Sequence, residues 1–195
     1  MELHIPNLDE LAQAHETFER REPRHRDYWL ALEGVEKGFR SDNLSDVASS
    51  VAGLLKSWHR EFYRWRPTRK TALETELRHL IMQHFQSIIS FRGRSLSGLA
   101  QGDRATVLKL FSSFEEKLGP VGSAKALNLV APSFFPLWDN AVAYGYGVVL
   151  AAHGYFLFMV LVKDQITRMS FPEGLEPLKT LDEYNYCKYT QGWIC

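Results

Sequence analysis

Lys125 and Asp139 are the two residues of this chain whose types and surroundings suggest covalent chemistry. Lys125 follows Gly-Pro-Val-Gly at 119–122, and Asp139 follows the apolar stretch Phe-Phe-Pro-Leu-Trp at 134–138. A helix that starts near Ser123 would hold Lys125 in its first turn, where the positive end of the helix dipole disfavours an ammonium ion. Partial burial would lower the pKa of this lysine further, and such an amine can form a Schiff base. We therefore predict that Lys125 is a nucleophile.

Asp139 has both a chemical and a structural interpretation. A carboxylate beside a breaking bond can stabilise positive charge that develops on a sugar, which would make Asp139 the partner of Lys125. An aspartate directly before a helix that begins at Asn140 can instead serve as its N-cap. Lys125 likewise can be a solvated or snorkelling lysine. Both interpretations of the pair stay open at the level of sequence.

The elements that would position these two residues are helices, because apolar residues recur at helical spacing along the chain. Helices are predicted over residues 7–21, 27–37, from 42 or 45 to before Pro67, from 71 to the glycines at 93 and 98, 103–118, from 123, 140–146, 155–169 and 181–189. Neither strand-like alternation nor an internal repeat is present. The fold class is therefore predicted as all-α, with one domain over residues 1–195.

Composition limits the partners and the compartment. The 23 basic residues balance the 23 acidic ones, so an anion would have to bind at a local patch, such as the arginines within 20–26 or 60–69. Two cysteines build neither a disulfide framework nor a four-cysteine metal site, which favours a cytoplasmic protein. No leader is recognised, and the apolar segment 148–162 is shorter than the ~20 residues that cross a bilayer. No membrane association is expected.

The stretch 103–147 resembles the helix-hairpin-helix DNA glycosylases. In that family a glycine-rich hairpin binds a DNA phosphate, a lysine in the following helix attacks the sugar carbon, and an aspartate follows after an apolar corner. The resemblance implies that Gly119, Val121 and Gly122 bind phosphate, that Lys125 is the nucleophile and that Asp139 assists it. It implies DNA as the partner and excision of a damaged base, with AP lyase activity. Here the order is Gly-Pro, where the family has Pro-Gly.

Further residues are predicted to contact DNA. Phosphate contacts are assigned to Arg64, Arg66, Arg92 and Arg94, and the base pocket or wedge to Trp138 and Tyr144. The aromatic residues Phe134 and Phe135 lie next to prolines and are predicted to belong to the core, as are Trp58, Phe62 and Trp65, which are spaced along one helical face. The whole chain is also similar to small uncharacterised bacterial proteins, a resemblance that implies no activity.

Cofactor and metal chemistry are not expected. The cysteine count excludes the iron–sulfur cluster of some glycosylases, and His79 and His84 are spaced by five residues, which does not place both on one helical face. No nucleophile elbow or phosphate-binding P-loop is present. Two other functions stay open: a non-catalytic helical module that binds DNA or an acidic protein, and a helical domain without a nucleic-acid role. The sequence indicates neither the lesion nor the oligomeric state.

Overall fold

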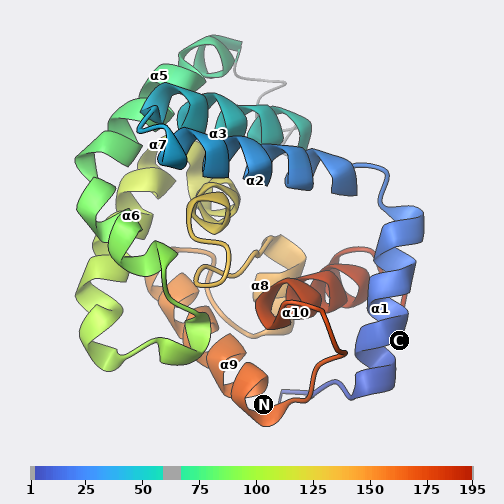
Figure 1. Cartoon of the computed structure of the whole chain (residues 1–195). Coiled ribbons are helices and arrows are strands. Elements are labelled where there is room, and N and C mark those ends of the chain that lie inside the picture. Colours follow the sequence, from blue (N-terminus) through green and yellow to red (C-terminus); the bar gives the residue numbers. More distant parts are fainter. Residues whose placement is uncertain (1–2, 59–66, 195) are drawn as a thin grey trace.

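A computed structural model describes residues 3–58 and 67–194 of the 195-residue chain. The described residues form helices joined by turns, with no β-strand among them (Figure 1). The predicted all-α class is therefore confirmed. Buried apolar side chains from α1 through α10 belong to one connected core cluster, which extends from Leu11 to Cys187.

The helices follow one another in the order shown in Figure 1. They are α1 (Leu8–Arg21), α2 (His25–Arg40), α3 (Leu44–Trp58), α5 (Pro67–Gln83), α6 (Phe85–Arg92), α7 (Arg104–Val130), α8 (Asn140–Gly145), α9 (Ala152–Arg168) and α10 (Pro177–Asn185). Two short 3-10 turns, η1 (Leu96–Gly98) and η2 (Gln101–Asp103), precede α7, and the π-helical turn η3 (Tyr186–Thr190) follows α10.

The two ends of the chain meet on one side of the molecule. Helices α2 and α3 pack side by side, while α10 and η3 pack against α1 on the right of Figure 1. Helix α7 contacts both α9 and the α2–α3 pair. Residues from the beginning, middle and end of the sequence, in α1, α7 and α10, line one pocket.

Several helix boundaries differ from those predicted. The predicted helix from 71 to 93 consists of α5 and α6, separated at His84, which leaves helical geometry at φ −108° and ψ 15°. Apolar residues continue in phase on both sides of this break, so their periodicity does not reveal it. The predicted continuation of α3 beyond Trp58, with Phe62, Trp65, Arg64 and Arg66, lies outside the described residues.

Local chemistry accounts for the start of α1 and the bend in α7. The Asn7 side chain accepts the Glu10 N–H while the Glu10 side chain accepts the Asn7 N–H, which forms a capping box. In α7 the helix is interrupted at Gly119, with φ 70° and ψ 169°, a conformation open essentially only to glycine. Pro120 then begins the second half of α7, residues 120–130, since a proline fits the first position of a helix.

An aromatic cluster fills the centre of the fold. Phe111 stacks on Tyr155 at 4.2 Å between ring centroids, and Trp138 stacks on Phe158 at 5.7 Å. Phe134 and Phe135 are fully buried, so their predicted place in the core is confirmed. Within residues 3–58 and 67–194, no helix combines the length and apolar character that crossing a bilayer requires.

Candidate functional site

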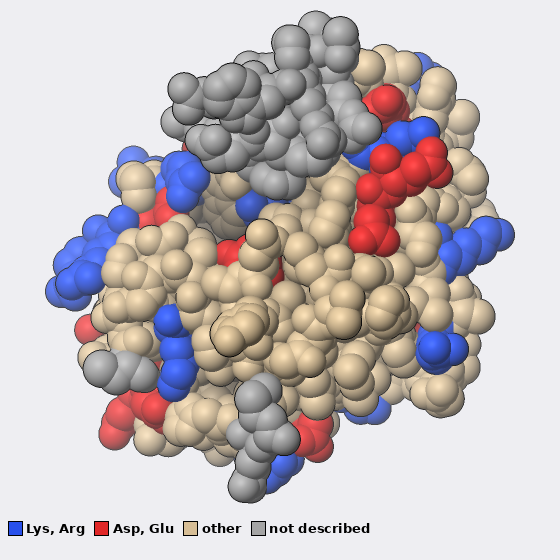
Figure 2. Space-filling view, turned by 180° about the vertical axis from the view of Figure 1, so that it is seen from behind, with Lys and Arg blue, Asp and Glu red and all other residues tan. Residues whose placement is uncertain are grey.

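A pocket lies where the end of α1, the end of α3, the second half of α7, α8, α10 and η3 meet. Its volume is about 80 Å³, and its lining is mostly apolar but includes both acidic and basic side chains. Figure 2 shows a hollow on this face of the molecule in which both acidic and basic atoms are visible. Lys125 and Asp139 both line this pocket. The structure therefore brings together the two residues that the sequence pairs only by hypothesis.

Lys125 is partly buried, and its ammonium group is held at the pocket wall. Its Nζ donates a hydrogen bond of 2.8 Å to the Trp58 carbonyl oxygen and lies 5.9 Å from the centre of the Trp58 ring. Burial lowers the pKa of Lys125 to about 8, because the charged form loses solvation. The negative charge of Asp139 opposes this shift and the positive charge of Arg24 adds to it.

The predicted helix start near Ser123 is wrong, and the correction changes why the Lys125 pKa is low. The second half of α7 begins at Pro120, so Lys125 lies in its second turn instead of its first. The helix dipole acts mainly within the first turn. Desolvation in the pocket is therefore the principal cause of the lowered pKa.

Asp139 caps α8 and faces the pocket at the same time. Its Oδ1 accepts the N–H groups of Ala141 and Val142, both at 2.9 Å, and its Oδ2 accepts the Thr190 hydroxyl at 2.7 Å. The N-cap interpretation is therefore correct, and it does not exclude the chemical one. Three donors fix this carboxylate in place beside the pocket that holds Lys125.

Ion pairs at the α1 and α10 sides complete the charged lining. Glu22 is bound by the Arg24 side chain, at 2.8 Å from Nε, and by the Tyr186 hydroxyl at 2.6 Å. Although burial raises the pKa of Glu22, these hydrogen bonds bring it below its ordinary value. Lys179 is hydrogen-bonded to Glu183, one turn further along the same helix, α10. The basic and acidic groups of the lining are thus largely paired.

Asp182 is the exception in the lining. It is buried, and its carboxylate accepts the Leu137 N–H, which lies 3.2 Å from Oδ1 and 3.1 Å from Oδ2. Burial raises its pKa well above the ordinary value of an aspartate, and the hydrogen bond from Leu137 and the attraction of Lys179 only partly offset this. The pocket therefore contains an amine with a lowered pKa and a carboxyl group with a raised one.

The predicted phosphate-binding hairpin is not confirmed. Within α7, Gly119 alone leaves helical geometry, so the chain bends there without a separate hairpin loop. Gly122 is buried, Val121 is partly buried, and the carbonyl oxygens of Gly119 and Pro120 accept hydrogen bonds from the side chains of Ser123 and Trp138. These atoms hold the bend to the core. None of the three predicted hairpin residues lines the pocket.

Arg92 and Arg94 have partners within the protein and do not line the pocket. Arg92 donates to the Val130 carbonyl oxygen and pairs with Glu36, whereas Arg94 binds Asp103 through both terminal nitrogens, at 2.9 and 2.7 Å. Both therefore act as internal ties between segments. Arg64 and Arg66 lie outside the described residues.

The two aromatic residues predicted for a base pocket or wedge lie in different environments. Trp138 lines the pocket but is only 2% exposed, and its Nε1 donates to the Pro120 carbonyl oxygen at 3.1 Å. It is therefore a fixed part of the core. Tyr144 is 87% exposed and does not line the pocket.

Sequence reasoning missed a cluster of His15, Glu19 and Glu183 at the junction of α1 and α10. The spacing of His15 and Glu19, one helical turn apart, was the available signal. Glu183 is distant in sequence, so the third member becomes visible only in the fold.

The chain was also compared with known proteins. No family model, curated protein or solved structure was found to match it. A functional assignment therefore has to start from the geometry of the pocket.

Proposed function

We propose that Lys125 forms a Schiff base with an aldehyde, and that the aldehyde is the ring-opened sugar of an abasic site in DNA. The protein would then act as an AP lyase. The observation that carries this proposal is the placement of Lys125, with a pKa of about 8, in a pocket that also holds Asp139. A pKa of 8 instead of 10.5 raises the fraction of free amine at pH 7 by about 300-fold.

The reaction would proceed through ordinary imine chemistry. The neutral Lys125 amine adds to the C1′ aldehyde carbon, and the resulting carbinolamine takes up a proton and loses water to give a positively charged iminium ion. Water then accepts a C2′ proton, the electron pair left behind forms the C2′–C3′ double bond, and the C3′–O bond to the 3′ phosphate breaks, which cleaves the strand. The fixed carboxylate of Asp139 supports the iminium charge, because its position is set by Ala141, Val142 and Thr190 before substrate arrives.

The size of the pocket favours the lyase over base excision. Pockets that enclose drug-sized ligands measure roughly 300–1,000 Å³, whereas this one has about 80 Å³. That space admits the few atoms of an aldehyde and the adjacent carbon, but not a nucleobase rotated out of the duplex. An abasic site has no base to accommodate. We therefore restrict the proposal to AP lyase chemistry.

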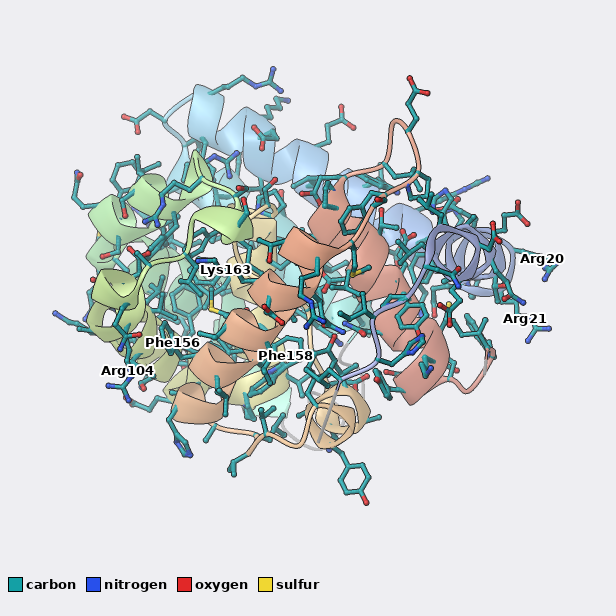
Figure 3. All side chains as sticks on the ribbon, turned by 90° about the horizontal axis from the view of Figure 1, so that it is seen from below. Arg20, Arg21, Arg104, Phe156, Phe158 and Lys163 are labelled. Carbon is teal, nitrogen blue, oxygen red and sulfur yellow. The ribbon has the colours of Figure 1, made fainter. Side chains whose placement is uncertain are left out.

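Exposed arginines beside the pocket suit a phosphate backbone. Arg20 and Arg21 lie in the last turn of α1, and their side chains extend away from the protein in Figure 3. Glu22, which follows them directly, lines the pocket. Phosphates on either side of a bound abasic sugar would thus meet these guanidinium groups. This assignment replaces Arg92 and Arg94 as the phosphate contacts.

The same exposed arginines favour a second candidate, a non-catalytic module that binds DNA or an acidic protein. The two candidates differ in what Lys125 contributes. A module would bind equally well after Lys125→Ala and would form no covalent adduct. Loss of affinity with rising salt would indicate phosphate contacts.

Borohydride trapping on a duplex with a single abasic site tests the proposal. Borohydride reduces an imine to a stable amine, so a Schiff-base enzyme becomes covalently attached to the DNA. We expect an adduct with the wild type and with Lys109→Ala, which removes an exposed lysine from the first half of α7. We expect none with Lys125→Ala. Equal trapping by Lys125→Ala, or no adduct with folded wild type, would refute the proposal.

A further inference from the structure

Three potential metal ligands meet where α10 packs against α1. His15 and Glu19 lie one turn apart on α1, and Glu183 comes from α10. The His15 Nδ1 and Glu183 Oε2 atoms are 2.7 Å apart, and one ligand atom from each of the three residues lies within 4.8 Å of the others. Atoms bound to one metal ion at about 2.1 Å must lie within about 4.2 Å of each other. Small side-chain rotations therefore suffice to bring all three onto one ion.

The burial of the three residues is graded from the core to the solvent. Glu183 is 3% exposed, His15 is partly buried, and Glu19 is exposed. A cation could therefore enter from the side of Glu19 and retain water there. The inner ligand, Glu183, is already oriented by the protein, which reduces the entropy lost on binding.

The contacts of Glu183 leave one of its two carboxylate oxygens available to a cation. Its Oε1 is occupied by Lys179, whereas its Oε2 faces His15. The proton of the His15–Glu183 hydrogen bond thus lies where a metal ion would sit. Glu19 supplies a second carboxylate, and Lys179 does not neutralise its charge. A divalent cation would therefore compensate the negative charge that remains in the cluster.

We propose that His15, Glu19 and Glu183 bind one divalent first-row transition-metal ion at the α1–α10 junction. One imidazole and two carboxylates form a mixed set that suits Zn²⁺ or Mn²⁺ better than Mg²⁺, because Mg²⁺ prefers oxygen ligands alone. Water would complete the coordination on the open side. The proposal does not depend on the function of Lys125.

A neighbouring histidine, His25, supports this assignment. His25 Nε2 lies 3.5 Å from Glu19 Oε2, and His25 Nδ1 is 2.8 Å from the Glu22 carbonyl oxygen. Partners of this kind orient a ligating carboxylate, and their loss typically weakens metal binding by about 10–100-fold. The ion would also tie α1 to α10, and Glu183 itself lines the pocket, so its binding would hold one pocket wall in place.

Calorimetric titration with Zn²⁺ and with Mg²⁺, on protein freed of any purification tag, tests the proposal. We expect one equivalent of Zn²⁺ to bind, with affinity at least about tenfold lower in His15→Gln and in Glu19→Gln. Glu16→Gln changes an exposed neighbour on the same helix and is expected to bind as the wild type does. Mg²⁺ is expected to bind more weakly.

Thermal unfolding provides an independent readout. Zn²⁺ should raise the unfolding temperature of the wild type and Glu16→Gln more than that of Glu19→Gln, since a ligand of the folded state stabilises it. Glu19 is exposed, so its replacement by glutamine leaves the fold intact. Absence of Zn²⁺ binding to the wild type, or unchanged Zn²⁺ affinity in both His15→Gln and Glu19→Gln, would overturn the proposal.

Discussion

Replacing Lys125 by methionine should increase the free energy of unfolding at neutral pH. The increase should be smaller at alkaline pH. In the folded protein the ammonium is partly removed from water, and burial lowers its pKa to about 8 from the ordinary 10.5. Because the folded-state pKa is the lower one, the folded protein binds fewer protons than the unfolded chain between these two values. Lys125 therefore costs stability below pH 8, and the cost disappears as the pH rises towards 10.5.

The magnitude follows from the size of the pKa shift. At pH 7 the charge of Lys125 costs about 3 kcal/mol, and at pH 10 about 1 kcal/mol. Methionine also loses the hydrogen bond to the Trp58 carbonyl oxygen, which is worth about 1 kcal/mol and does not depend on pH. The expected gain in the free energy of unfolding is thus about 2 kcal/mol at pH 7, falling to near zero at pH 10.

Urea denaturation of wild type and Lys125→Met at pH 7 and at pH 10 measures this difference. Lys109→Met, at an exposed position of the same helix, controls for the general effect of removing a lysine. The decisive quantity is the change in the Lys125→Met effect between the two pH values. A stability difference that stays constant with pH, while the control behaves as expected, would show that the Lys125 pKa is not lowered.

The remaining predictions concern the elements that position the site, and urea denaturation measures each of them. Gly119→Ala should lower the free energy of unfolding by about 1–3 kcal/mol, because φ 70° with ψ 169° is strained for alanine. An unchanged value would show that the bend adapts. Asp139→Ala should cost about 1 kcal/mol through loss of the α8 cap, while Asp139→Asn should retain most of it, since asparagine caps equally well. Equal losses would show that charge matters more than capping. Phe111→Ala should cost about 3–5 kcal/mol, and a loss below about 1 kcal/mol would contradict its central packing.

Local signals made much of the fold predictable. The helix predicted over residues 7–21 is α1, and Asp139 caps α8 as the sequence indicates, because a cap depends only on neighbouring residues. The core positions of Phe134 and Phe135 also follow from their apolar, proline-bounded surroundings. These features need no knowledge of distant contacts.

The features that the sequence does not reveal depend on geometry or on distant partners. A hairpin and a one-residue bend at Gly119 have the same glycine and proline composition, so only the backbone angles separate them. The lowered pKa of Lys125 comes from its burial in the pocket, which helical periodicity does not specify. The contact between His15 and Glu183 joins residues 168 positions apart.

Mass-spectrometric mapping of the borohydride-reduced adduct tests the central claim most directly. Wild-type protein would be treated with abasic DNA and borohydride at neutral pH, digested with nuclease and protease, and searched for the peptide that carries the sugar remnant. Our account predicts modification at Lys125. Modification at an α-amino group or another lysine, with Lys125 unmodified, would contradict it.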